Sequence, residues 1–108
     1  MPVKAYIAGI SGQQLTEAER VFFSGAMPWG FILFARNMAN PEQVRALTSE
    51  LRALGGRDDL PIFIDQEGGR VQRMRPPHWP SYPAGRVLGA VYAQDDRNGL
   101  RAAWLQSR

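Results

Sequence analysis

The chain has 108 residues, of which 44% are hydrophobic, and its formal net charge is +3. This length suffices for one small domain with a core, and the apolar content excludes a disordered chain. The lack of cysteine excludes disulfides, thiolate metal sites and cysteine nucleophiles. No apolar run could span a bilayer, and residues 1–5 lack the apolar core of a signal peptide. We therefore expect a cytoplasmic protein that does not bind a membrane.

Almost all of the positive charge is arginine, and Arg70, Arg73 and Arg75 are its tightest group. Acidic residues are interspersed along the chain, and no predicted helix carries a basic stripe. We therefore expect no nucleic-acid binding, which usually needs a basic face. Arginine near a strand end suits contacts with carboxylate, phosphate or sugar oxygens instead.

The first predicted elements are a strand over residues 5–10 and a helix that begins near Thr16. Thr16 and Glu19 form a capping box, in which each side chain bonds the other residue's backbone N–H. The expected packing stripe of this helix follows i, i+3, i+4, i+7 spacing and consists of Ala18, Val21, Phe22 and Gly25.

A second strand is expected over residues 30–35, because its continuous apolar run is typical of a buried parallel strand. Asn40 and Pro41 then begin a helix, with asparagine as the cap and proline at the first position. Its apolar residues are Val44, Leu47, Leu51 and Leu54. The pair Gly55–Gly56 ends this helix, and the third strand covers residues 62–64.

The remainder of the chain is predicted to hold a long proline-rich loop over residues 76–83 and one last helix. That helix begins near Asp95 or Asp96 and carries Leu100, Ala103 and Trp104. Strands that alternate with helices predict an α/β fold with a parallel sheet. We expect one domain over residues 1–108, either as a very small α/β unit or as the opening part of something larger.

The most informative segment is the polar string from Asp65 to Arg73, which follows the third strand directly. Carboxylates and guanidinium groups at a strand end can hold a polyhydroxylated ligand. Gly68 and Gly69 would let the backbone turn sharply or approach that ligand closely. The alternative interpretation is a solvated turn.

Three segments in this order resemble the start of family 3 glycoside hydrolases. They cover residues 30–37, 40–43 and 64–73, and the segment 76–80 continues the likeness. The closest likeness is to the bacterial β-N-acetylhexosaminidase branch, which releases N-acetylglucosamine from muropeptides in peptidoglycan recycling. The resemblance implies a (β/α)8 barrel of the TIM type, of which residues 1–108 would supply about the first three βα units.

The resemblance also implies roles for particular residues. Asp65 and Arg73 correspond to substrate-binding positions that contact the sugar. Glu67, Arg70, Arg36 and Asn37 would shape the loops or play secondary roles. The expected ligand is an N-acetylglucosamine-containing muropeptide, the intact enzyme would be retaining, and neither a cofactor nor a metal is implied.

The sequence departs from the family because the catalytic motifs do not occur in these residues. The family's nucleophile is an aspartate further along the barrel, and its acid/base is a histidine in a Lys-His-Phe-Pro-Gly-His-like motif. We therefore assign no catalytic residue and expect the 108-residue chain to be inactive alone. Asp65 and Glu67 are unsuitable as the catalytic carboxylate pair, because neighbours on one loop rarely flank a bond from both faces.

Other interpretations concern His78 and the chain as a whole. His78 could act as a general acid or base, but its proline-rich surroundings favour a loop histidine packed by Trp79. The whole chain could instead be a non-catalytic sugar- or muropeptide-binding module, or a small arginine-rich protein that binds anions or nucleic acid.

Overall fold

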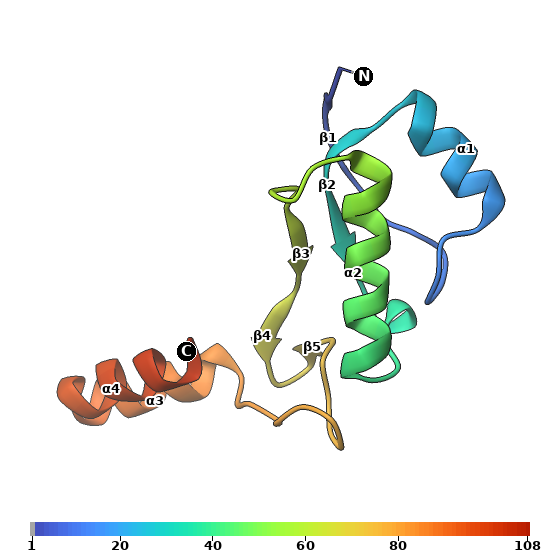
Figure 1. The fold of residues 1–108 in the computed structure, drawn as a ribbon. Helices are drawn as coiled ribbons and strands as arrows, with labels where there is room; N and C mark the ends of the chain where they lie inside the picture. The colour runs from blue at the N-terminus through green and yellow to red at the C-terminus, as the bar shows by residue number, and fades with distance from the viewer. Residues whose placement is uncertain (1) are drawn as a thin grey trace. The chain divides into compact units, whose positions relative to one another are not determined.

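The computed structural model describes residues 2–108 (Figure 1). The chain divides between Asp65 and Gln66 into two compact units. The first unit contains a three-stranded parallel sheet in the order β1–β2–β3. Its strands are β1 (Lys4–Ala8), β2 (Pro28–Leu33) and β3 (Ile62–Ile64). Its helices are α1 (Glu17–Gly25) and α2 (Pro41–Gly55), with the short 3₁₀ helix η1 (Ala35–Asn37) between β2 and α2. The expected order of strand, helix, strand, helix and strand is confirmed.

Helix α2 forms as the sequence predicts. The Asn40 side chain accepts a hydrogen bond from the Gln43 N–H at 2.8 Å, and Pro41 occupies the first helical turn. At the other end, Gly56 adopts the left-handed conformation, with φ of 63°. Val44, Leu47 and Leu51 are buried, so the expected spacing marks the face that packs on the sheet.

Helix α1 begins where expected, but its predicted packing stripe is wrong. Thr16 and Glu19 form both bonds of the capping box. Val21 and Phe22 are 67% and 60% exposed, whereas Phe23 is buried. Phe23 enters the core because its ring meets the Phe31 ring edge-on, with centroids 5.1 Å apart.

The core lies between the two helices and one face of the sheet. Its buried members are Ile10, Leu15, Phe23, Met27, Phe31, Leu33, Leu47, Leu51 and Leu60. An ion pair between Arg20 and Glu50 also joins α1 to α2.

The opposite face of the sheet is only partly covered. Side chains alternate across a strand, so the residues between the core positions point to this face. On that face, Ile7 and Phe63 are 47% and 38% exposed. The third strand is therefore only partly covered in this structure.

The second unit holds two elements that the sequence analysis did not predict. The polar string contains a short antiparallel hairpin of β4 (Gln66–Gly68) and β5 (Val71–Gln72), where a loop was expected. Helix α3 (Gly85–Gln94) was not predicted, because it has no side-chain cap and contains two glycines. Its apolar residues Val87, Leu88 and Val91 do have helical spacing.

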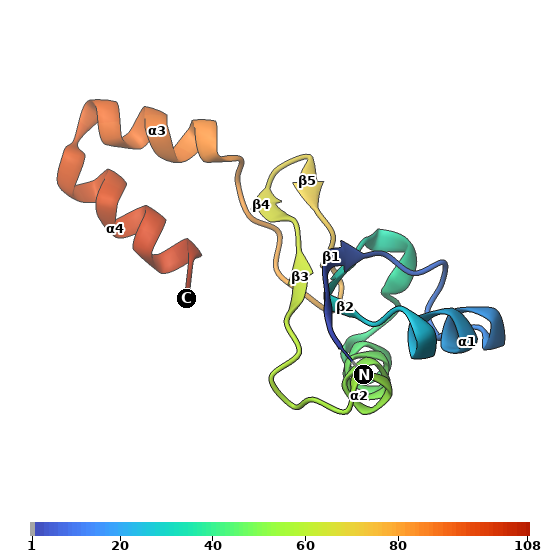
Figure 2. The same cartoon turned by 90° about the horizontal axis from the view of Figure 1, so that it is seen from above.

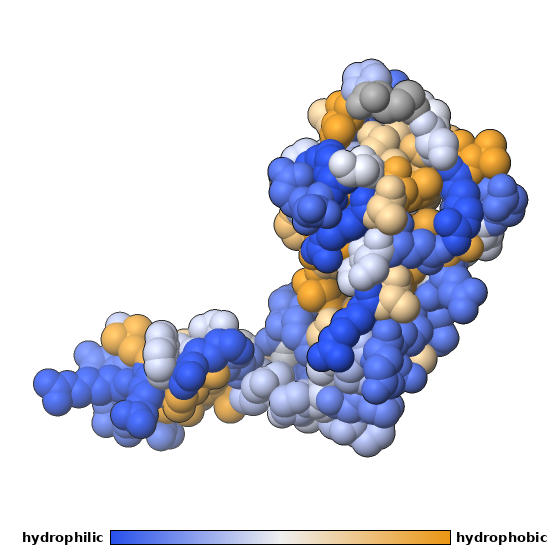
Figure 3. Space-filling view, viewed as in Figure 1, coloured by the Kyte–Doolittle hydropathy of each residue, from blue (hydrophilic) through white to orange (hydrophobic). Residues whose placement is uncertain are grey.

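The last helix is confirmed as α4 (Asp96–Gln106), with Asp95 as its cap. Figure 2 shows α3 and α4 diverging from their junction at Asp95. Gly99 permits close packing there, because a Cβ at that position would lie 2.3 Å from the Tyr92 Cα. Much of the apolar surface of α3 and α4 is exposed (Figure 3), including Val87, Tyr92, Leu100, Trp104 and Leu105. Within residues 2–108, no helix is long and apolar enough to cross a membrane.

The capping box gives a testable pH dependence. Burial raises the pKa of the Glu19 carboxyl, but hydrogen bonds from the backbone N–H groups of Thr16 and Ser11 outweigh it and lower the pKa overall. A lowered folded-state pKa stabilises the fold above the unfolded-state pKa, and this stabilisation is lost as pH falls through the folded value. We expect Glu19→Gln to destabilise the chain at neutral pH and to flatten its stability profile in acid.

The measurement is urea unfolding followed by circular dichroism across the acidic range. Glu17→Gln is the matched control, because it removes the same charge from the same helical turn but does not bond the cap. Equal pH profiles for the two variants would contradict the capping contribution of Glu19.

Candidate functional site

The first unit brings three of the predicted site residues to the carboxyl edge of its sheet. Asp65 follows β3, and Arg36 and Asn37 follow β2. The two strands are neighbours, with Leu33 paired to Ile64, so their ends lie at the same edge. Carboxyl edges of parallel sheets are common ligand-binding positions because the loops there converge.

Asn37 is fully buried and ties the loops of this edge together. Its Nδ2 donates to the carbonyls of Ile10 and Gly12, at 3.2 and 2.7 Å. Its Oδ1 accepts from the Phe34 N–H at 2.8 Å. Because these bonds satisfy both ends of the amide, Asn37 holds the loop after β1 against the end of β2. This geometry supports a loop-shaping role for Asn37.

Arg36 makes contacts of a similar kind, although its side chain is exposed. Its Nε donates to the Ile10 carbonyl at 3.1 Å, and its guanidinium carbon lies 4.8 Å from the centre of the Phe34 ring. Arg36 therefore braces the same loop, and these contacts support the loop-shaping role that the sequence analysis gave it.

The second unit contains the rest of the polar string, from Gln66 to Arg73. Gly68 and Gly69 have φ of 92° and 60°, so the sharp turn expected of them is present. A Cβ on Gly68 would lie 2.1 Å from the Pro83 carbonyl oxygen. The Gly69 N–H also donates to the Tyr82 carbonyl at 2.7 Å. The hairpin turn is thus packed directly on the backbone of residues 82–84.

Glu67, Arg70 and Arg73 lie on or beside this hairpin. Glu67 and Arg70 are exposed, and Arg73 is partly buried just after β5. The Arg70 carbonyl accepts a bond from Arg75 at 3.0 Å, and the Glu67 carbonyl accepts one from Gln106 at 3.4 Å. These are backbone contacts, so the loop-shaping roles of the Glu67 and Arg70 side chains stay predictions.

Two glutamines of the string were missed by the sequence analysis. Gln66 and Gln72 face each other in the β4–β5 pair, and the Gln72 side chain is almost completely buried. An amide beside charged residues looks like a solvated side chain in sequence. The sequence carries no signal that distinguishes a solvated glutamine from a glutamine whose side chain bonds only to the backbone.

The remaining candidates behave as structural or surface groups. The His78 ring packs edge-on against Trp79, with centroids 5.8 Å apart, as the sequence analysis favoured. His78 itself is exposed, in a loop that contains a cis peptide bond between Pro76 and Pro77. Residues 2–108 contain no group of three His, Cys, Asp or Glu side chains that could hold a metal ion.

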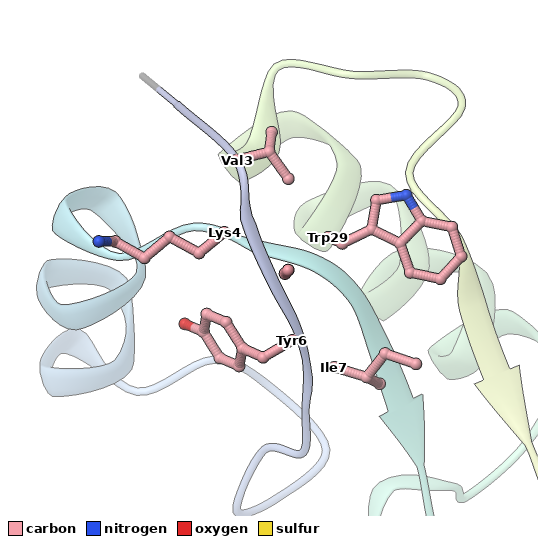
Figure 4. Close-up of a pocket in the computed structure, with 6 residues that line it drawn as sticks. Val3, Lys4, Tyr6, Ile7 and Trp29 are labelled. Atoms are coloured by element: carbon pink, nitrogen blue, oxygen red, sulfur yellow. The ribbon is translucent and has the colours of Figure 1, made fainter.

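An apolar hollow of the first unit lies away from these residues, along β1 (Figure 4). It is lined by Val3, Lys4, Ala5, Tyr6, Ile7 and Trp29. Lys4 and Trp29 stand near the starts of β1 and β2, which is the opposite end of the strands from Asp65. Because this hollow offers few polar groups, it does not suit a polyhydroxylated ligand.

The chain is similar in sequence to proteins named Beta-hexosaminidase. It is 39% identical over 103 residues to that of Bordetella avium, covering 95% of this chain and 29% of that protein. It is 47% identical over 87 residues to that of Alkalilimnicola ehrlichii, covering 81% of this chain and 24% of that protein. No protein-family model matches the chain.

Solved structures agree with these relatives. The chain superposes on NagZ from Neisseria gonorrhoeae with a TM-score of 0.77 and 40% identity, over 88% of this chain and 28% of that protein. The chain is a homologue of the beta-hexosaminidases. A second structure of that NagZ contains N-trifluoroacetyl-D-glucosamine. The structure of a family 3 β-N-acetylglucosaminidase from Paenibacillus aligns with 82% of this chain, with a TM-score of 0.70 and 34% sequence identity.

The chain spans less than a third of the length of the curated relatives it matches. Its α/β fold, with a parallel sheet and helices, resembles the corresponding part of NagZ. The comparisons thus bear out the resemblance seen in the polar string and in the segments before it.

The turn between β4 and β5 gives a second testable prediction. We expect Gly68→Ala to destabilise the second unit by more than about 1 kcal/mol, because alanine is strained at this φ and its methyl would meet the Pro83 carbonyl. Gly89→Ala is the matched control, because it lies in α3 with open space around it. Alanine there should stabilise the helix by about 0.5–1 kcal/mol.

The readouts are urea unfolding and the hydrogen-exchange rate of the Gly69 N–H, which is bonded to Tyr82. Faster exchange is expected in Gly68→Ala and not in Gly89→Ala. An unchanged Gly69 exchange rate in Gly68→Ala would show that the turn does not depend on glycine.

Proposed function

We propose that this chain forms part of the sugar-binding site of a family 3 β-N-acetylhexosaminidase. Such an enzyme hydrolyses terminal β-N-acetylglucosamine, and muropeptides of peptidoglycan recycling are the proposed substrates. The observation that carries this proposal is the similarity to beta-hexosaminidases over most of the chain. The position of Asp65 at the carboxyl edge of a parallel sheet supports it independently.

The proposed architecture of the whole enzyme is a (β/α)8 barrel of the TIM type, with residues 1–108 at its beginning. Three parallel strands in chain order, with α1 and α2 packed on one face, fit the start of such a barrel. The opposite face carries Ile7 and Phe63. The centroids of the Trp29 and Phe63 rings lie 5.8 Å apart. In a closed barrel this partly exposed apolar face would be the filled interior.

Asp65 and Arg73 are proposed to bind the sugar with opposite polarity. The carboxylate of Asp65 would accept hydrogen bonds from ring hydroxyls, and the guanidinium of Arg73 would donate to sugar oxygens. Charged hydrogen bonds are stronger than neutral ones, so two such groups can fix the orientation of the ring. They raise the rate where they tighten as the ring distorts toward the transition state.

The nucleophile and the acid/base are proposed to come from parts of the enzyme outside residues 1–108. In a retaining mechanism one carboxylate attacks the anomeric carbon, and a second group protonates the leaving oxygen. We propose that Asp65 and Glu67 take neither role and that the 108-residue chain does not turn over substrate alone. The proposed enzyme needs no cofactor, and a cytoplasmic location stays a prediction from the sequence.

The test is a chimera in which this chain replaces the matched segment of the Neisseria gonorrhoeae NagZ. We expect the chimera to hydrolyse a chromogenic N-acetylglucosaminide and the isolated chain not to do so. Asp65→Ala should lower kcat/KM by about 10- to 100-fold, the loss expected for a charged hydrogen bond. Asp58→Ala is the control, because this exposed aspartate carries the same charge away from the carboxyl edge.

The outcomes separate the alternatives. A folded chimera without turnover would reject the enzymatic role, and turnover by the isolated chain would reject its dependence on further residues. Saturable N-acetylglucosamine binding without turnover would favour the non-catalytic module. A steep fall of affinity with salt, for an anionic ligand, would favour the arginine-rich binding protein.

A further inference from the structure

We propose that Gln66 and Gln72 are positioning residues that hold the main chain around Arg73 and thereby direct its guanidinium toward the sugar. This inference rests on the proposed function, in which Arg73 contacts the substrate. The two glutamines lie on the opposed strands β4 and β5, where they are paired directly with each other. Neither was assigned a role from the sequence.

Gln66 binds the backbone at Arg73 itself. Its Oε1 accepts hydrogen bonds from the N–H groups of Arg73 and Met74, both at 3.0 Å. Its Nε2 donates to the Met74 carbonyl at 2.9 Å. One side-chain amide thus fixes two consecutive backbone N–H groups and one carbonyl, immediately after β5 ends.

Gln72 binds the same segment from the other side and joins it to the proline-rich loop. Its Nε2 donates to the carbonyls of Met74 and Pro80, both at 2.7 Å. Its Oε1 accepts from the Tyr82 N–H at 3.0 Å. The side chain is buried, with a residue exposure of 1%, so water does not compete for these bonds.

The two amides converge on one atom. The Met74 carbonyl oxygen accepts from both Gln66 and Gln72, which uses both of its lone pairs. Arg73 therefore lies between Gln72, which is anchored to the loop, and Met74, which is held by two donors. This clamp restricts the backbone from which the Arg73 side chain extends.

Only an amide supplies this set of bonds, since each glutamine both donates and accepts. An ionised glutamate in either position keeps the acceptor and loses every donor. At Gln66 the acceptor carries both bonds to the Arg73 and Met74 N–H groups, and Gln66→Glu keeps these two bonds. Its second carboxylate oxygen would face the Met74 carbonyl oxygen with no proton between them, so only part of the hold is retained. At Gln72 the donors carry two of three bonds, so Gln72→Glu loses most of it.

Positioning of this kind affects the rate because small displacements of a binding group are costly. A shift of about 1 Å far from the chemistry can lower the rate by about 10²-fold. Loss of the clamp should therefore weaken the contribution of Arg73 without removing the guanidinium itself. Its effect should vanish when Arg73 has already been removed.

The experiment is a double-mutant cycle in the NagZ chimera, with circular dichroism and melting to confirm folding. We expect Gln66→Met to lower kcat/KM by about 10-fold or more, and Gln66→Glu to recover part of the loss through its bonds to the Arg73 and Met74 N–H groups. In an Arg73→Ala background, Gln66→Met should cost little further activity, because the two changes act through one group. Gln94→Met is the control, because Gln94 is exposed at the end of α3.

Each outcome decides the proposal. Equal fractional losses from Gln66→Met with and without Arg73 would overturn it, because the effect would then be general destabilisation. If the unsubstituted chimera folds but is inactive, the proposed function fails, and the clamp is judged by hydrogen exchange in the 108-residue chain. Faster exchange of the Arg73 and Met74 N–H groups in Gln66→Met would support the backbone hold, and unchanged exchange would overturn it.

Discussion

Parallel pairing of β2 with both of its neighbours is the constraint on which the first unit depends. Phe31, in the middle of β2, is fully buried and pairs with Ala8 on one side and Ile62 on the other. Because the three strands run in one direction, the residues after each strand meet at one edge. That edge receives Asp65, Arg36 and Asn37, and the helices must return across one face of the sheet.

The polar string is organised by its neutral residues more than by its charged ones. Gly68 and Gly69 permit a turn that packs on the Pro83 carbonyl and Ala84, which a side chain at either position would block. Gln66 and Gln72 then satisfy backbone groups that would otherwise lose hydrogen bonds on burial. Charged side chains such as Glu67 and Arg70 stay at the surface of this scaffold.

The uncovered sheet face and the length of the relatives point in the same direction. Ile7 and Phe63 present apolar surface on the side away from α1 and α2, and the exposed Trp29 ring packs against Phe63. The curated relatives are more than three times as long as the segment that this chain matches. In the proposed barrel, further βα units would cover such a face and pair the outer edges of β1 and β3, which is how a barrel removes exposed strand edges.

The sequence by itself determined the helices and strands that are marked by caps, helix stops or continuous apolar runs. The caps at Thr16 and Asn40, the stop at Gly56 and the apolar run of β2 act over a few residues, so their helices and strands could be predicted. The resemblance to the beta-hexosaminidases followed from the order of the motifs, and with it the proposed roles of Asp65 and Arg73. Only the tertiary structure decided that Phe23 rather than Phe22 enters the core. It also decided that Gln66 and Gln72 clamp the backbone and that a hairpin replaces the expected loop. These features depend on contacts between residues far apart in the chain or on backbone partners, and neither leaves a periodic pattern in the sequence.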